Sequence, residues 1–192
     1  MDVGSVKRIH QSDWKNEGIR FLRARDIVAF SKKEEPKDQL YIDKDKYDEY
    51  SKISGKVKPG DLLVTGVGSI GVPMLIKSKN PVYFKDGNII WFKNNNSLLD
   101  GDFFYYSFTS NRVQSFIKKS SGAGTVGTYT IDNGKKTPIQ ISKSQSEQKQ
   151  IGEFLNYVDS LIALHQRNQK GLQNRGPPIK TINLYTFLYQ TR

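Results

Sequence analysis

The sequence predicts an α+β fold: a twisted, mostly antiparallel sheet with short helices, followed by a C-terminal helix of coiled-coil type. Three patterns support this class. Short β-favouring runs separated by glycine-containing turns fill the first half of the chain. Phenylalanines recur at three- and four-residue spacing after Asp100, and a longer apolar stripe begins at Ile151. We expect a domain over residues 1–143, a spacer or dimerisation helix over 144–171, and a tail over 172–192.

Composition limits the classes of function. The chain of 192 residues has no cysteine, which excludes disulfides, thiolate metal sites and thiol nucleophiles. With no signal peptide and no apolar stretch of membrane-spanning length, a cytoplasmic location is expected. The 30 Lys and Arg residues exceed the 19 Asp and Glu residues and give a net charge of +11, which favours a polyanionic partner. Four of these cations follow Gln169 without an acid, so solubility or a basic tail is the alternative explanation.

The first 56 residues give mixed signals. Residues 1–17 are polar and predict a loop, whereas 18–25 favour a strand that residues 26–30 continue. Residues 31–56 are heavily charged and predict a solvated connection. Within them, 43–47 begin like a calcium-binding loop, but the third acid and the glycine of that motif are missing.

Residues 57–76 predict a central strand, turn and strand. The turn Pro59-Gly60-Asp61 leads into an apolar run, and a glycine-rich turn separates it from a second run over 72–76. The glycines 66, 68 and 71 match the G-x-G-x-x-G pattern of dinucleotide sites. That motif requires a helix after its last glycine, and Pro73 stands among β-favouring residues there instead. We interpret the glycines as a hairpin turn.

The later elements follow the same reasoning. Residues 82–92 predict a hairpin around Asp86-Gly87. From Asp100 the spacing predicts two short helices that bend near Ser110, with an aromatic stripe that belongs to the core rather than to a base-stacking platform. Residues 130–142 predict two short strands around 132–134.

The segment 118–129 combines two lysines with small hydrogen-bond donors and three glycines. Such a loop lets a backbone approach a phosphate or a base edge closely. A flexible surface loop explains the same composition, and both interpretations stay open at this stage.

A capping box formed by Ser144 and Glu147 predicts the start of the last helix, and Gly171, Gly176 and the following prolines predict its end. An apolar seam runs along this helix and needs either a partner helix or the body of the domain to bury it. His165 is interpreted as a register-setting polar residue of that seam, not a metal ligand, since His10 is the only other histidine. The residues of this dimerisation seam are Ile151, Phe154, Leu155, Val158, Leu161, Ile162 and His165.

The order of these parts resembles the specificity subunits of Type I restriction-modification systems. The resemblance covers residues 4–170 and rests on four segments: the strand 19–27, the Gly60-Asp61-Leu62-Leu63 core with its glycine turn, the aromatic helix ending in a Gly-Thr loop, and the helix opening at 147–152. Three features depart from the family pattern: Ser144 replaces a proline, an apolar segment before the first loop is missing, and the sequence after Gln169 differs.

The resemblance implies a function. In that family each target recognition domain reads one half of a split duplex DNA site, and helices forming a coiled coil space the two halves. The chain would carry no chemistry and no cofactor, and would direct methyltransferase subunits and an endonuclease/translocase subunit. One such domain resembles a half-subunit that would form a homodimer on a palindromic split site. A truncated or frame-shifted subunit is the alternative.

Direct readout of DNA needs Arg, Gln or Asn at base edges, while Lys, Ser, Thr and backbone amides contact phosphates. Arg20 lies at odd spacing from Arg23 and Arg25, so at least one of the three is expected to form a structural ion pair. A sequence-indifferent RNA or single-strand binder is the alternative function, whereas an enzyme acting on nucleic acid lacks a coherent set of catalytic residues. The candidate DNA-binding residues are Lys7, Arg8, Gln11, Arg20, Arg23, Arg25, Ser69, Lys118, Lys119, Thr125, Thr128 and Tyr129.

Overall fold

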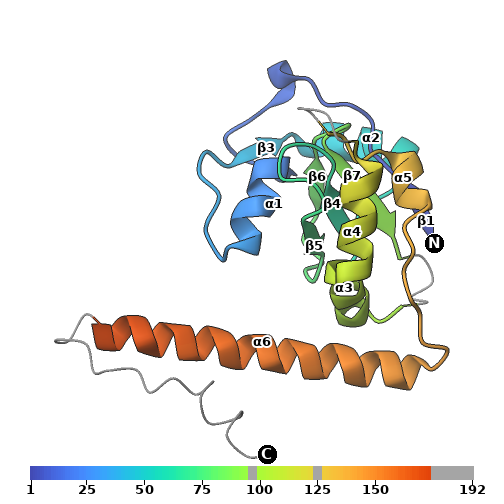
Figure 1. Ribbon diagram of the computed structural model, residues 1–192. Helices are drawn as coiled ribbons and strands as arrows, with labels where there is room; N and C mark the ends of the chain where they lie inside the picture. Colours follow the sequence, from blue (N-terminus) through green and yellow to red (C-terminus); the bar gives the residue numbers. More distant parts are fainter. Residues whose placement is uncertain (95–98, 123–126, 174–192) are drawn as a thin grey trace, which may run out of the picture. The chain divides into compact units, whose positions relative to one another are not determined.

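The computed structural model describes residues 1–94, 99–122 and 127–173, and their side chains up to Gln169 (Figure 1). The chain divides into two compact units, Met1–Glu153 and Phe154–Arg192. Among the described residues, the sheets and the first five helices lie in the first unit, while the last helix, α6, begins in the first unit and continues into the second. No described helix is long and apolar enough to cross a bilayer.

Two sheets form the first unit, so the predicted α+β class with mostly antiparallel pairing is confirmed. One sheet is antiparallel throughout and has the order β1 (Asp2–Gly4), β7 (Ile89–Lys93), β4 (Leu62–Thr65), β5 (Pro73–Leu75). The other has the order β3 (Leu40–Ile42), β2 (Ile19–Leu22), β6 (Val82–Phe84), with β2 antiparallel to β3 and parallel to β6.

Helices and one short 3-10 turn connect and cover these strands. The 3-10 turn spans Gln11–Asp13. The helices are α1 (Ala24–Ser31), α2 (Lys44–Ser54), α3 (Gly101–Thr109), α4 (Asn111–Ser120), α5 (Ile131–Lys135) and α6 (Gln145–Gln173).

The central hairpin and the two short helices after Asp100 form as predicted. Leu62 pairs with Leu75 across β4 and β5, and the glycine turn joins these strands. Ser110 separates α3 from α4, and its hydroxyl caps α4 by accepting a hydrogen bond from the Val113 amide. Phe104 and Phe108 are buried against Phe92, which confirms that the aromatic stripe is core.

The predictions for the first 56 residues need correction. The N-terminal loop contains β1, because residues 2–4 add an edge strand to β7. Strand β2 ends at Leu22, because the Asp26 carboxylate accepts a hydrogen bond from the Arg23 amide and starts α1 instead of letting the strand continue. The charged connection contains β3 and α2, whose buried Ile42 and Tyr47 join the core.

Two predicted hairpins are also wrong. Strands β6 and β7 both exist, but β6 pairs in parallel with β2 while β7 lies in the other sheet between β1 and β4. The Asp86-Gly87 turn therefore crosses from one sheet to the other. Residues 131–135 form α5 instead of a strand, since the Thr130 hydroxyl caps a helix by accepting from the Asn133 amide. At the far end of the chain, α6 passes through Gly171 rather than ending there.

Candidate nucleic-acid interface

The glycine turn between β4 and β5 is fixed by backbone hydrogen bonds on both sides. The Gly66 amide donates to the Asn88 carbonyl at 2.8 Å, and the Gly66 carbonyl accepts from the Tyr129 amide at 2.9 Å. A Cβ at position 66 would lie 2.8 Å from the Tyr129 oxygen, so glycine permits this close approach. The Thr65 hydroxyl donates to the Ser69 carbonyl inside the turn. These bonds leave the Ser69 side chain exposed at the apex.

Helix α4 packs directly against this turn. Gly71 has a φ of +81°, and a Cβ there would lie 3.0 Å from Ile117 of α4. The Gln114 side-chain amide donates to the Gly71 carbonyl at 3.2 Å and to the Phe108 carbonyl at 2.9 Å. The last turn of α4, which carries Lys118 and Lys119, is thereby held beside the glycine turn.

An open groove of about 450 Å³ lies where the turn, α4 and the following loop meet. The Thr128 amide donates to the Ser121 carbonyl at 3.0 Å, which returns the loop to the end of α4 and leaves the Thr128 side chain exposed. Of the predicted contacts, Lys118 lines this groove, and Ser69, Lys119 and Thr128 are exposed sequence neighbours of residues that line it. We call this the turn–α4 surface; its residues are Ser69, Ile70, Gln114, Ile117, Lys118, Lys119, Ser121, Gly122, Gly127 and Thr128.

Positive charge on this part of the chain has little compensation. Between Phe103 and Ser146 the sequence holds six Lys and Arg residues and a single acid, Asp132. Within the described ranges, none of the six forms an ion pair with an acidic residue. A polyanion would find these cations available. They are Arg112, Lys118, Lys119, Lys135, Lys136 and Lys143.

A second group of predicted contacts lies on the loop between β1 and β2. Gln11 is exposed at the start of the 3-10 turn, and the Lys7 ammonium lies 4.2 Å from the centre of the Tyr50 ring. Arg8 is 66% exposed and its Nε lies 2.8 Å from Asp86. Asp86 and Asn88 belong to one turn, and Asn88 holds the glycine turn, so this loop and the turn–α4 surface share a support. Both lie toward the upper edge of the first unit in Figure 1.

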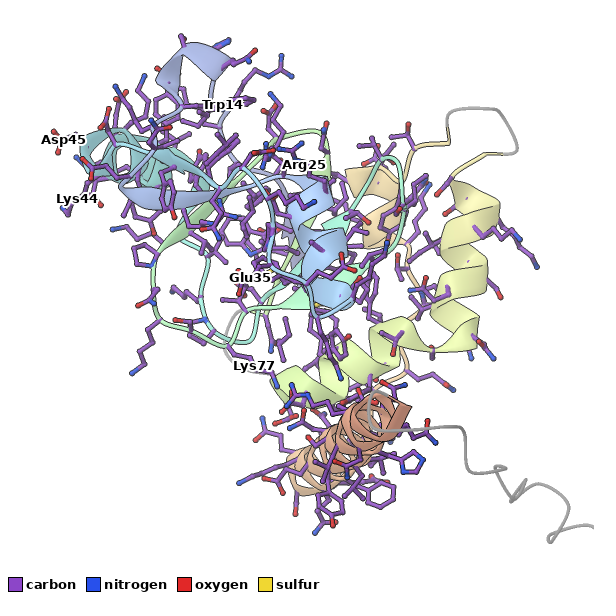
Figure 2. All side chains as sticks on the ribbon, turned by 90° about the vertical axis from the view of Figure 1, so that its left-hand side faces the viewer. Trp14, Arg25, Glu35, Lys44, Asp45 and Lys77 are labelled. Carbon is purple, nitrogen blue, oxygen red and sulfur yellow. The ribbon has the colours of Figure 1, made fainter. Side chains whose placement is uncertain are left out.

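The three early arginines have different roles. Arg23 makes two hydrogen bonds to Asp26, which is 1% exposed, and donates to the Asp38 carbonyl at 2.6 Å. This buried ion pair confirms that at least one of the three arginines is structural. Arg20 donates to the Leu40 carbonyl at 2.9 Å and lies over the Tyr41 ring. Arg25 is exposed and pairs with exposed Asp38, and it lies on α1, so strand alternation does not govern it (Figure 2).

Tyr129 belongs to the core and has no surface for DNA. Its ring is fully buried, and its hydroxyl shares a hydrogen bond with the Thr137 hydroxyl. Burial raises the pKa of the Tyr129 hydroxyl to about 12. Its selection from sequence as a contact is therefore wrong for the side chain. Thr125 lies outside the described residues.

The stretch that begins like a calcium loop is the first turn of a helix. Asp43 precedes α2 and pairs with Lys15, while Lys44 and Lys46 pair with Asp48 and Asp13. Lys44 and Asp45 are labelled in Figure 2. Hydrogen bonds from Lys44 and Lys56 lower the pKa of Asp48 to about 2. Among the described residues, no cluster of three His, Cys, Asp or Glu side chains fits a metal ion.

Sequence reasoning missed the residues that hold these surfaces in place. Gln114 fixes α4 to the glycine turn, and Asp86 holds Arg8, yet neither stands out in the sequence. The Asp86-Gly87 pair indicates only a turn, and Gln114 is an ordinary polar position on an amphipathic helix. Only the non-local contact reveals their roles.

Helix α6 begins at the predicted cap, where the Ser144 hydroxyl accepts from the Glu147 amide at 3.3 Å, while the Glu147 carboxylate accepts from the Ser142 hydroxyl. Its apolar stripe is open: Phe154 is 64% exposed, Leu161 46% and Ile162 49%. Tyr157 and Leu164, which the predicted seam omitted, are exposed as well. At 100° per residue these side chains cover roughly half of the helix circumference.

Comparison with known proteins gives a consistent result. A family model described as Type I restriction modification DNA specificity domain matches residues 6–174. A putative type I restriction enzyme specificity subunit of Haemophilus influenzae, S.HindORF215P, is 31% identical over 164 residues, which cover 83% of this chain and 39% of that protein.

Solved structures share the fold at low sequence identity. A chain from a structural study of complex assembly and conformational transition of the type I R-M system has a TM-score of 0.60 at 13% identity, over 90% of this chain and 39% of its own. The S subunit of a Type-I restriction-modification system from M. genitalium has a TM-score of 0.55 at 18% identity, over 88% of this chain and 40% of its own. The chain therefore spans about two fifths of the length of these relatives.

Proposed function

The chain belongs to the Type I restriction modification DNA specificity domain family, and from this membership we propose that it recognises part of a duplex DNA site for a restriction-modification complex. Specificity subunits are the non-catalytic members of these systems. Methylation and cleavage would then reside in partner methyltransferase and endonuclease subunits that the chain directs to DNA.

One observation carries the proposal: the turn–α4 surface gathers exposed lysines, hydroxyls and a groove on a rigid support. Lys118 and Lys119 would neutralise phosphates and release counterions. Ser69 and Thr128 would donate to phosphate oxygens and fix the register of the protein on the duplex. Base edges would be read from the neighbouring loop, where Arg8 and Gln11 carry the side chains suited to guanine and adenine.

The buried aromatic residues favour duplex DNA over single-stranded nucleic acid. A single-strand binder stacks successive bases on exposed rings. In the described domain, Phe103, Phe104 and Phe108 are buried in the core. Backbone and groove contacts, which suit a duplex, are what the exposed side chains can make.

We further propose that the stripe of α6 packs against the same helix of a second copy. An isolated helix with so wide an apolar face gains little stability in water until another surface covers it. Paired helices would hold two recognition domains at a fixed spacing, and two-fold symmetry would require a palindromic split site.

Selection from a random duplex pool tests the proposal. The full chain is immobilised, bound DNA is recovered and sequenced, and binding of the enriched duplex is compared with a scrambled duplex at raised salt. A sequence-specific reader keeps a large affinity ratio, of the order of a thousandfold, between the two. Equal affinity for both duplexes, or preference for single-stranded DNA or RNA, would contradict the proposed function.

A further inference from the structure

The contact between Arg8 and Asp86 joins an exposed cation to a nearly buried acid. The Arg8 Nε donates to Asp86 Oδ2 at 2.8 Å, and the two side chains are 66% and 11% exposed. Ordinary surface ion pairs have both partners in water and contribute little. We infer that Asp86 is a positioning residue, which orients the Arg8 guanidinium toward DNA; this inference rests on the proposed function.

The backbone that carries Arg8 is fixed before its side chain begins. The Lys7 amide donates to the Ser54 hydroxyl at 2.8 Å, and the Tyr83 hydroxyl donates to the Lys7 carbonyl at 2.7 Å. Val6 and Ile9, on either side, are buried in the core. The loop therefore presents Arg8 from a rigid base, which limits the entropy lost when the side chain binds.

Asp86 is equally well supported. It lies between buried Phe84 and Ile89, in a turn held by the Lys85 amide, which donates to the Leu22 carbonyl at 2.8 Å. Its second oxygen, Oδ1, is buried and has no hydrogen-bond partner among the described residues. Such an unsatisfied buried acceptor lowers stability. A role in binding explains why an acid is placed at this position.

The geometry defines what Arg8 can bind. Its Nε is occupied by Asp86, whereas Nη1 and Nη2 have no partner among the described residues. These two amino groups form a planar fork that matches a pair of acceptor atoms. On duplex DNA, the O6 and N7 atoms of guanine or two oxygens of one phosphate provide such a pair.

Removal of the Asp86 charge distinguishes positioning from simple electrostatics. If Asp86 only repels phosphates, Asp86→Asn should strengthen binding to every duplex. If it positions Arg8, the same variant should weaken binding to the preferred duplex while binding to a scrambled duplex is unchanged or stronger. Asp48→Asn is the matched control, because it removes one acidic charge that is also ion-paired, with Lys44 of α2 and with Lys56 just after that helix.

The test measures affinity of the full chain for a duplex enriched from a random pool and for a scrambled duplex of the same composition. We expect Asp86→Asn to reduce the ratio of these affinities by roughly tenfold, Arg8→Ala to reduce it by at least as much, and the double variant to fall no further than Arg8→Ala. Asp48→Asn should leave the ratio unchanged. An unchanged or increased ratio for Asp86→Asn would overturn the inference.

Arg8→Lys provides a second test that does not depend on removing Asp86. Lysine keeps the charge and can still pair with Asp86 but lacks the fork, so the affinity ratio should fall while binding to the scrambled duplex persists. Equal affinities of Arg8→Lys and the parent chain would contradict the inference. Loss of preference at one guanine identifies a base contact, whereas equal weakening on both duplexes, as a lost phosphate contact gives, leaves the ratio unchanged and overturns the inference. If no duplex is enriched at all, the proposed function fails, and this inference with it.

Discussion

Single buried acids hold much of this domain together. Asp61 accepts hydrogen bonds from the Trp91 indole at 2.9 Å, the Lys58 amide at 2.9 Å and the Asn94 amide at 2.8 Å. The sequence presents Asp61 only as a turn residue after Gly60. In the structure its carboxylate ties the start of β4 to both the middle and the end of β7, so Asp61 stabilises the fold through contacts 30 and 33 residues away in the sequence.

Asp61→Ala should therefore be strongly destabilising. The change leaves three donors without an acceptor in or near the core, and each buried unsatisfied group costs about 1–3 kcal/mol. We expect the free energy of unfolding in urea to fall by about 3 kcal/mol or more. Glu35→Ala, in an exposed loop (Figure 2), is the control and should stay within about 0.5 kcal/mol of the parent chain. Similar values for the two variants would show that the Asp61 network contributes nothing.

The buried hydroxyl of Tyr129 should make the free energy of unfolding depend on pH in the alkaline range. Burial raises the pKa of its hydroxyl from 10.0 to about 12, and that of Tyr83 likewise. Folding thus favours the protonated phenols, so their contribution is fully present below pH 10 and is lost as the pH rises from 10 toward 12. Tyr129→Phe should be about 1 kcal/mol less stable at neutral pH, because it loses the bond to Thr137.

The same variant should lose stability less steeply above pH 10 than the parent chain. Urea unfolding at pH 8, 9, 10 and 11 measures both effects. Lysines titrate in this range in both proteins, so only the difference in slope is informative. Identical slopes would show that the Tyr129 hydroxyl is not the group responsible.

At the scale of elements, local signals predicted what local interactions determine. The β4–β5 hairpin and the division of α3 from α4 follow from turn glycines and from the Ser110 cap, all within a few residues. Strand β6 pairs with β2, which lies about sixty residues earlier, and no local pattern encodes that partner. The Asp86-Gly87 pair correctly predicts a turn, but the strands on either side of it belong to different sheets and form no hairpin.

The candidate site shows the same limit. Ser69, Lys118 and Lys119 were selected for their chemistry, but their proximity depends on the contact of Gly71 with Ile117, which the sequence does not display. The sequence suggests Tyr129 as a DNA contact because a tyrosine after a glycine-rich loop has the same local context whether it is exposed or buried. Burial and neighbourhood are properties of the tertiary fold.

Substitutions at two glycines of the same turn distinguish the cost of a left-handed backbone from the cost of a close packing contact. Gly68 and Gly71 both have positive φ, but a Cβ at 68 meets nothing within 4 Å, while at 71 it meets Ile117 at 3.0 Å. Gly68→Ala should cost only the left-handed conformation, about 1–2 kcal/mol. Gly71→Ala should lower the free energy of unfolding by about 1–3 kcal/mol more than Gly68→Ala does, because its methyl group also overpacks the contact with α4.

The affinity for DNA provides a second measurement on Gly68→Ala and Gly71→Ala. Gly71→Ala should displace the end of α4 and weaken binding to the enriched duplex, whereas Gly68→Ala should bind as the parent chain does once both are measured below their unfolding temperatures. Equal stability and equal binding for the two variants would mean that α4 does not depend on the turn.

Over the whole chain, the distribution of charge determines where a polyanion can be attracted. The net charge of +11 is spread over the chain, but many described cations are already paired with acids, among them Arg25 with Asp38 and both Lys44 and Lys56 with Asp48. The lysines at the end of α4 have no acidic partner within the described ranges. Long-range attraction to DNA should therefore depend on this end of the domain more than on its total charge.

Salt dependence tests this distribution. Replacing Lys118 and Lys119 together by alanine should lower the slope of log affinity against log salt by roughly two, one for each lost phosphate contact. In the control, exposed Lys32 and Lys52 are replaced by alanine, which removes the same amount of charge from the ends of α1 and α2. If both double variants change the slope equally, net charge rather than the turn–α4 surface governs binding.

The proposed pairing of two copies through α6 can be tested by changing its apolar stripe. We expect Phe154→Lys with Leu161→Lys to abolish self-association, because charges in a helix seam lose hydration when a partner helix covers them. Asn156→Lys with Ser160→Lys adds the same charge to the opposite, polar side of α6 and should leave association intact. Sedimentation across a concentration series compares the masses with the 21.9 kDa monomer.

The same variants also connect association with recognition. If two copies pair through α6, the parent chain should enrich a palindromic split duplex, and Phe154→Lys with Leu161→Lys should bind that duplex with the weaker affinity of a single half-site. The variant should still distinguish the half-site from a scrambled sequence, because the turn–α4 surface and Arg8 lie outside the altered residues. A parent chain that sediments as a monomer at every concentration and enriches a single, unsplit site would contradict pairing while leaving DNA recognition in place.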